Sequence, residues 1–127
     1  MIPNFRAWLK EEKEMIDVDE IHWYRGKFEF IGDGITFQRL ANEVELMQST
    51  GLKDKNGKEV FEGDIVTNGI EIEDIKNHQT LGFYTVLDDR EYFLSSGISV
   101  EDFEEYADEF SQIAKIIGNI YENPELL

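Results

Sequence analysis

Ten glycines divide this chain into short segments, and no other feature of the sequence constrains its fold as strongly. They recur from Gly26 to Gly118, whereas the only prolines, Pro3 and Pro124, lie at the two ends. Glycines spaced in this way are typical of many short strands joined by tight turns. The spacing therefore predicts one continuous, mainly β protein with little helix.

Three hairpins are expected within this pattern. The clearest is centred on Asn56-Gly57, because Asn-Gly can supply the two positive φ values of a type I′ turn. Its strands would be residues 51–53 and 59–61. The other two hairpins join 21–24 to 27–31 through Arg25-Gly26, and 82–87 to 92–94 through residues 88–91.

The two ends of the chain give less uniform signals. Residues 113–121 carry apolar side chains at both odd and even positions, which predicts a strand covered on two faces, with Gly118 at a bulge or close approach. Residues 3–13 fit a helix about as well as a strand that turns at residues 11–14. The N-terminal pattern leaves both open.

Only the segment from Ser99 to Phe110 has a helical period. Its apolar residues fall within an arc of roughly 120° at 100° per residue, and Ser99 is placed to cap the N-terminus. The opposite face carries acidic side chains and no lysine or arginine. These residues are Glu101, Asp102, Glu104, Glu105, Asp108 and Glu109.

Composition excludes several classes of protein. The absence of cysteine removes disulfides, thiolate metal sites and thiol nucleophiles, and it suits a reducing cytoplasm, where we expect the protein to reside. We expect no signal peptide and no membrane span, because residues 1–12 hold no continuous apolar core and no apolar run approaches membrane-spanning length. No Gly-x-Ser-x-Gly elbow or nucleotide-binding loop occurs, so we expect neither an enzyme nor a cofactor.

The net charge of −16 disfavours direct binding to nucleic acid, because a phosphate backbone would be repelled unless a local basic patch intervened. The acidity is concentrated in residues 63–127, which hold 15 acidic and 3 basic residues, against 13 and 9 in residues 1–62. The expected partner is therefore a protein with a basic surface, and a homo-oligomer is left open.

Three blocks of sequence resemble the YopX family of phage and prophage proteins. They are residues 5–8 (FRAW), 45–66 (ELMQSTGLKDKNGKEVFEGDIV) and 117–127 (IGNIYENPELL). The resemblance implies a β-rich portion over residues 1–45, followed by an SH3-like barrel over 46–127 that includes the helix. It implies no established activity, and it carries over no binding or catalytic residue to this chain.

The acidic face of the predicted helix is the main candidate site. Like-charged pairs four residues apart, such as Glu101 with Glu105, should each destabilise the helix by roughly 0.2 to 0.5 kcal/mol unless something cationic relieves them. We therefore hypothesise that this face docks a basic partner, for example as a mimic of DNA that occupies a host DNA-binding protein. A solvated face that only keeps the protein soluble is the more common explanation.

Other candidates are weaker. Asp88, Asp89 and Glu91, or the run from Asp17 to Glu20, could give oxygen ligands to Mg²⁺ or Ca²⁺ in a metal-assisted enzyme. The Asp54–Gly57 segment fails the calcium-loop pattern, so a turn is expected there. His22 and His78 lie in no catalytic motif and are assigned structural or surface roles. An aromatic peptide groove is the alternative to core packing for Trp8, Trp23, Phe28 and Phe30.

Overall fold

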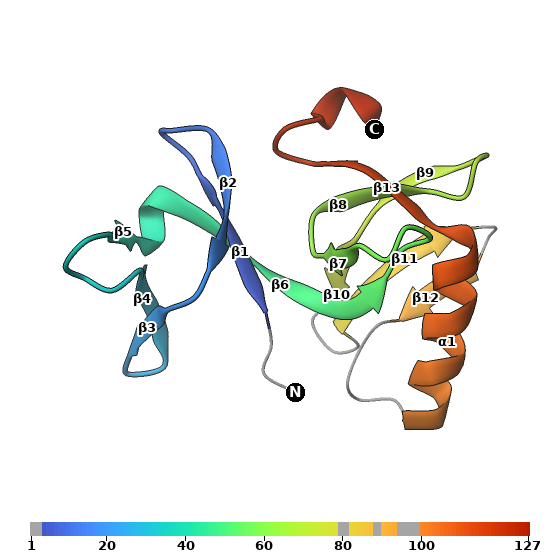
Figure 1. The fold of residues 1–127 in the computed structure, drawn as a ribbon, viewed down its shortest axis with the longest axis horizontal. Helices are drawn as coiled ribbons and strands as arrows, with labels where there is room; N and C mark the ends of the chain where they lie inside the picture. The colour runs from blue at the N-terminus through green and yellow to red at the C-terminus, as the bar shows by residue number, and fades with distance from the viewer. Residues whose placement is uncertain (1–3, 79–81, 88–89, 94–99) are drawn as a thin grey trace. The chain divides into compact units, whose positions relative to one another are not determined.

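The computed structural model describes residues 4–78, 82–87, 90–93 and 100–127. Backbone contacts divide the chain into two compact units, Met1–Gln48 and Ser49–Leu127, called here the N-terminal and the C-terminal unit. Strand β6 (Val44–Lys53) runs through the boundary (Figure 1). The described residues form a mainly β protein with one α-helix, as the sequence predicts. The finer prediction of an SH3-like barrel stays a prediction.

The N-terminal unit is built on two antiparallel sheets. In the first, β1 lies between β2 and the first half of β6, so that Ala7 faces both Ile16 and Leu46. In the second, β4 lies between β3 and β5. The bounds are β1 Phe5–Leu9, β2 Glu14–Val18, β3 Ile21–Tyr24, β4 Lys27–Ile31, β5 Arg39–Leu40 and the 3-10 helix η1 Ala41–Glu43.

The N-terminal segment is a strand, which settles the choice between helix and strand. Side chains alternate along β1 with a period of two, and Ala7 and Leu9 are 0% and 2% exposed. Both edges of β1 are paired, so its backbone groups are satisfied by two neighbouring strands. Ala7 and Leu9 join Ile31 and Val44 in the core of this unit.

The C-terminal unit contains the other strands and the helix. Strand β7 pairs with the second half of β6, β8 lies between β13 and β9, and β11 lies between β10 and β12. The bounds are β7 Glu59–Phe61, β8 Asp64–Thr67, β9 Ile72–Asp74, β10 Lys76–His78, β11 Gly82–Leu87, β12 Arg90–Phe93, α1 Val100–Ile113, β13 Lys115–Asn119 and the 3-10 helix η2 Pro124–Leu126.

The predicted helix is present but longer than expected. It runs from Val100 to Ile113, three residues beyond Phe110, and Ser99 lies outside the described residues. Phe110 is fully buried and packs in one core with Leu52 and Val66. Figure 1 shows α1 beside β12 at one side of the unit, and the two elements are in contact. This packing anchors one face of the helix and leaves the other to solvent.

The Asn-Gly hairpin is present, but its predicted type I′ geometry is wrong. Among the turn residues 54–58, only Gly57 has a positive φ, of 78°. Its N–H donates to the carbonyl of Asp54 at 3.0 Å. That is the pattern of a type I turn followed by a left-handed glycine. The cause is the Asp54 carboxylate, which accepts the N–H groups of Asn56 and Lys58 at 2.9 Å each and fixes the wider loop.

Two consecutive positive φ values occur instead at Arg25 (51°) and Gly26 (78°), between β3 and β4. This hairpin and the β11–β12 hairpin are both confirmed. The second turn is shorter than predicted, because Arg90 and Glu91 already pair with β11, and residues 88 and 89 lie outside the described residues. The arginine in the left-handed region adds strain at the β3–β4 turn, since a side chain is disfavoured there.

Gly118 lies at the bulge that the sequence predicts. The β13–β8 register shifts between Ile116 and Gly118. A Cβ atom at position 118 would lie 2.5 Å from the Oδ1 atom of Asn123, so any larger residue would force the Asn123 side chain to shift. The same Oδ1 atom accepts the N–H of Asn119 at 3.2 Å, which closes the turn after β13.

Candidate functional site

The acidic face of α1 is exposed where the structure describes it. Glu104, Glu105 and Asp108 are exposed, and Glu109 is partly buried. The helix includes Glu101 and Asp102, whose side chains lie outside the described part. The structure therefore places the predicted residues on one helix, and it shows three of them open to solvent.

The charges of this face are not balanced within the described part of the chain. No lysine or arginine there forms a salt bridge with Glu104, Glu105 or Asp108, and the last turn of α1 holds no basic residue. Asp108 accepts a hydrogen bond from the Nε2 atom of Gln112 at 3.2 Å, which is a neutral donor. These three carboxylates thus have no cationic partner among the described residues.

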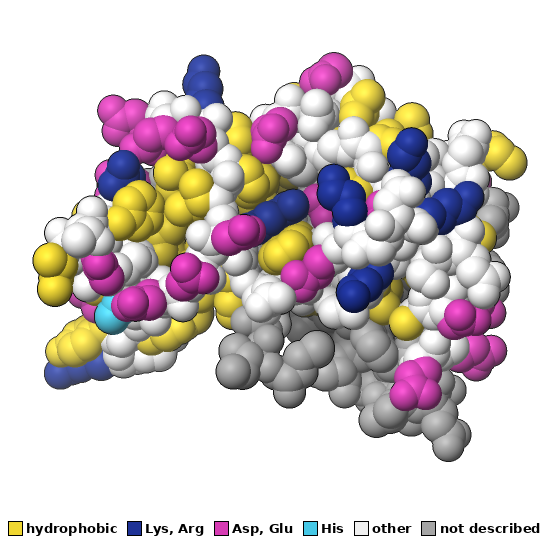
Figure 2. Space-filling view, in the orientation of Figure 1, with side chains coloured by type: hydrophobic (Ala, Val, Ile, Leu, Met, Phe, Trp, Pro, Cys, Tyr) yellow, Lys and Arg dark blue, Asp and Glu magenta, His cyan; other side chains and the backbone are white. Residues whose placement is uncertain are grey.

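Cations of the C-terminal unit gather elsewhere. Four exposed lysines lie at the β6–β7 turn and at the start of β13, and Figure 2 shows dark blue side chains grouped over this part of the molecule. The N–H of Lys55 donates to the carbonyl of Ala114 at 2.8 Å, which holds the turn beside β13. We call this group the lysine cluster. It consists of Lys53, Lys55, Lys58 and Lys115.

Three other described cations have carboxylate partners. Lys10 lies 3.3 Å from Glu45, Arg39 lies 2.8 Å from Glu12, and Lys76 lies 3.0 Å from Asp74. These pairs are partly exposed and each contributes little to stability. They show that side chains of opposite charge meet in this fold where the backbone brings them together, whereas Glu104, Glu105 and Asp108 have no such partner in the described part of the chain.

A buried carboxylate organises the β6–β7 turn, and sequence reasoning did not assign it that role. Asp54 is 3% exposed. Burial alone would raise its pKa, but backbone N–H donors from Ile116, Lys58 and Asn56 outweigh burial and hold the pKa below its ordinary value. The residue is charged and structural, so the interpretation of this segment as a turn and not a metal loop fits its contacts.

The first set of predicted metal ligands falls on residues whose side chains the structure does not describe. Asp88 and Asp89 lie outside the described residues, and Glu91 lies in β12 with no description of its side chain. Within the described residues, no three His, Asp or Glu side chains are grouped to hold a metal ion.

Carboxylates of the Asp17–Glu20 run lie instead on the wall of a cleft in the N-terminal unit. The cleft has a volume of about 320 Å³, and its other walls include Ile31, Asp33 and Phe37. Asp33 is occupied by its own loop, since its carboxylate accepts the N–H groups of residues 35, 36 and 37. The cleft combines apolar and acidic walls.

The four aromatic residues singled out in the sequence differ in burial. Trp8, Phe28 and Phe30 are partly buried, whereas Trp23 is 57% exposed. Trp23 therefore departs from the core packing expected of most of these residues. Its position near the end of a short edge strand, where the core ends, explains the difference.

Neither histidine lies beside a catalytic group in the described part of the chain. His22 stacks on Phe30, with ring centroids 4.2 Å apart, and its Nε2 atom lies 3.6 Å from an oxygen of Glu20. His78 lies in β10, and its side chain is outside the description. The structural role predicted for His22 agrees with this stacking.

Comparison with known proteins places the chain in a family. The family model described as YopX protein matches residues 4–127. The chain belongs to the YopX family. Among solved structures, it is similar to protein EF1440 from Enterococcus faecalis, with 32% identity, a TM-score of 0.64, and coverage of 100% of this chain and 99% of that one. The search of curated proteins found no match.

The family and the solved relative carry no named activity. In the described part of this YopX chain, no helix is long and apolar enough to cross a bilayer.

Proposed function

We propose that this YopX protein is an accessory protein of a phage or prophage that acts by binding and not by catalysis. In this proposal, the acidic face of α1 contacts a basic surface on a protein partner. The placement of charge supports it most directly: Glu104, Glu105 and Asp108 are exposed without a described cation beside them, while the lysine cluster lies elsewhere in the same unit.

The physical reason is the cost of crowding like charges on one helix. Carboxylates four residues apart repel one another, and no basic residue lies in the last turn of α1 to offset them. A cationic partner surface would remove that repulsion and would also speed association by electrostatic steering. Phe110 holds the opposite side of the helix in the core, so the acidic face is presented on a rigid element.

The test is capture of a partner with a matched pair of variants. The wild-type chain is immobilised and exposed to lysate of the bacterial host, and a specifically retained protein is identified and purified. Its affinity is then measured for the wild type and for Glu104→Lys/Glu105→Lys. We expect a loss of affinity of at least tenfold for that variant, because two attractive charges become repulsive.

The control reverses two exposed carboxylates of the N-terminal unit, Glu11→Lys/Glu14→Lys, and so changes the net charge by the same amount. Equal loss in both variants would show that only net charge matters and would contradict a docking face on α1. Competition with double-stranded DNA tests the narrower hypothesis that the acidic face mimics DNA. Displacement of the partner by DNA supports mimicry of a phosphate backbone, and a partner that DNA does not displace excludes it.

A further inference from the structure

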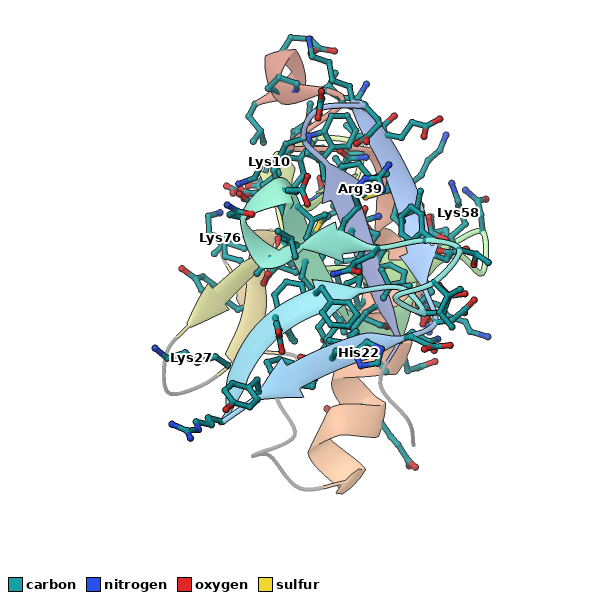
Figure 3. The ribbon with its side chains drawn as sticks, turned by 90° about the vertical axis from the view of Figure 1, so that its left-hand side faces the viewer. Lys10, His22, Lys27, Arg39, Lys58 and Lys76 are labelled. Carbon is teal, nitrogen blue, oxygen red and sulfur yellow. The ribbon has the colours of Figure 1, made fainter. Side chains whose placement is uncertain are left out.

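Strand β3 has an outer edge that no described strand covers. In the sheet of order β3-β4-β5, β3 (Ile21–Tyr24) is terminal, and no described strand pairs with its outer side. Figure 3 shows this strand, marked by His22, as the outermost of its sheet. An open edge presents a row of backbone donors and acceptors that can pair with another strand.

The turn end of this strand carries exposed aromatic side chains beside cations. Trp23 is 57% and Tyr24 60% exposed, and the Arg25 guanidinium lies 5.3 Å from the centre of the Tyr24 ring. Lys27 follows across the turn and is also exposed. Tryptophan, tyrosine and arginine are the residues most enriched at the centres of protein interfaces.

The other end of the same strand is acidic. Asp19 and Glu20 come directly before Ile21, are both exposed, and lie on the wall of the 320 Å³ cleft. Four strand residues span only about 13 Å, yet this is beyond the reach of a salt bridge between the two ends. Each molecule therefore holds an acidic and a basic end that cannot pair with each other.

We propose that β3 pairs with β3 of a second copy, in antiparallel orientation and about a two-fold axis. In an isologous strand pair, one residue must face its own equivalent, because paired residues point to the same side of the sheet. With His22 at that position, Ile21 faces Trp23 of the second copy, and the acidic residues that precede the strand come close to the turn that carries Arg25 of the second copy. Both contacts then occur twice.

Charge complementarity selects this orientation and this occupant. Antiparallel pairing brings each acidic end to the basic end of the other copy, whereas parallel pairing would place Arg25 beside Arg25 and Asp19 beside Asp19. Ile21 opposite Trp23 is the kind of β-branched and aromatic pair that stabilises antiparallel strands. The exposed ring of Tyr24 would then lie at the mouth of the cleft of the second copy.

The first test is sedimentation equilibrium of the full chain over a range of concentrations. We expect a dimer whose dissociation constant rises on the order of tenfold or more in Arg25→Glu and in Asp19→Arg, and returns toward the wild-type value in Asp19→Arg/Arg25→Glu. Lys58→Glu is the control, because it changes the net charge as Arg25→Glu does, in the other unit. A monomeric wild type, or a double variant that does not recover, would overturn the proposal.

The second test uses the absence of cysteine in this chain. In the proposed register the two His22 residues face each other, so His22→Cys should form an intermolecular disulfide on mild oxidation. Tyr24→Cys should not, since its two copies would lie about 13 Å apart, beyond the Cα separation of a disulfide. Cross-linking of the Tyr24→Cys protein but not of the His22→Cys protein would refute the register.

Discussion

The carboxylate of Asp54 accepts a hydrogen bond at 3.0 Å from the backbone N–H of Ile116, which lies 62 positions further along the chain. The other oxygen accepts the N–H groups of Asn56 and Lys58, so one buried side chain joins the β6–β7 turn to the start of β13. Local turn geometry and a long-range contact thus depend on a single residue. This connection also fixes the positions of the backbone that carries the lysine cluster.

Removing that carboxylate should destabilise the protein substantially. Asp54→Ala leaves three partly buried backbone donors without an acceptor, and we expect the free energy of unfolding to fall by about 3 kcal/mol, measured by urea denaturation. Asp33→Ala is the matched control, since Asp33 also accepts three backbone N–H groups but in an exposed loop. Its effect should be less than half as large. Equal losses of unfolding free energy in Asp54→Ala and Asp33→Ala would mean that the burial of Asp54 does not determine the effect.

The same residue predicts a dependence on pH. Backbone donors hold the pKa of Asp54 in the folded protein below its ordinary value of 3.8. The charged carboxylate therefore stabilises the fold fully above that value, and this contribution is lost as pH falls through the folded-state pKa. The difference in unfolding free energy between wild type and Asp54→Asn, measured from pH 7 downward, should stay constant to about pH 4 and then shrink. A difference that grows below pH 4 would contradict this.

The turn after β13 gives a third prediction. Gly118→Ala places a methyl group 2.5 Å from the Oδ1 atom of Asn123, which must move and release the N–H of Asn119. We expect a loss of roughly 1 to 3 kcal/mol in the free energy of unfolding. Adding Asn123→Ala removes the two nearest clashing atoms, Oδ1 and Cγ, and leaves only its Cβ atom at 2.9 Å, so Gly118→Ala should be less harmful in that background. An unchanged effect of Gly118→Ala in the double variant would refute the clash.

The sequence predicts the strands better than the turns between them. Apolar alternation places β3 and β4 correctly, because the side chains that cover a core leave a period of two in the sequence. Turn type depends on contacts that the pattern does not contain. Asn56-Gly57 has the residues of a type I′ turn, yet the Asp54 carboxylate imposes another geometry, and Arg25-Gly26 adopts the two positive φ values instead.

The surfaces were predictable only where a single element forms them. The acidic face of α1 can be read from a helical period, since one helix carries all its members. The lysine cluster combines residues 53–58 with Lys115, which are far apart in sequence and are joined by the bond from Lys55 to Ala114. Exposure of Trp23 depends on where the core of the N-terminal unit ends. Neither the lysine cluster nor the exposure of Trp23 can be predicted from a local sequence pattern.

The repulsion on α1 gives the last prediction. Glu105 is four residues from Glu101 on one side and from Glu109 on the other, so Glu105→Gln removes two unfavourable pairs and keeps the shape of the side chain. The free energy of unfolding should rise by about 0.4 to 1 kcal/mol at low salt. Added NaCl should reduce this gain, because ions screen repulsion between exposed charges. Thermal unfolding at 20 mM and 500 mM NaCl measures both effects, and Glu125→Gln, an exposed carboxylate of η2, should show neither. A gain for Glu105→Gln that is equal at both salt concentrations would mean that helix propensity, and not repulsion, is the cause.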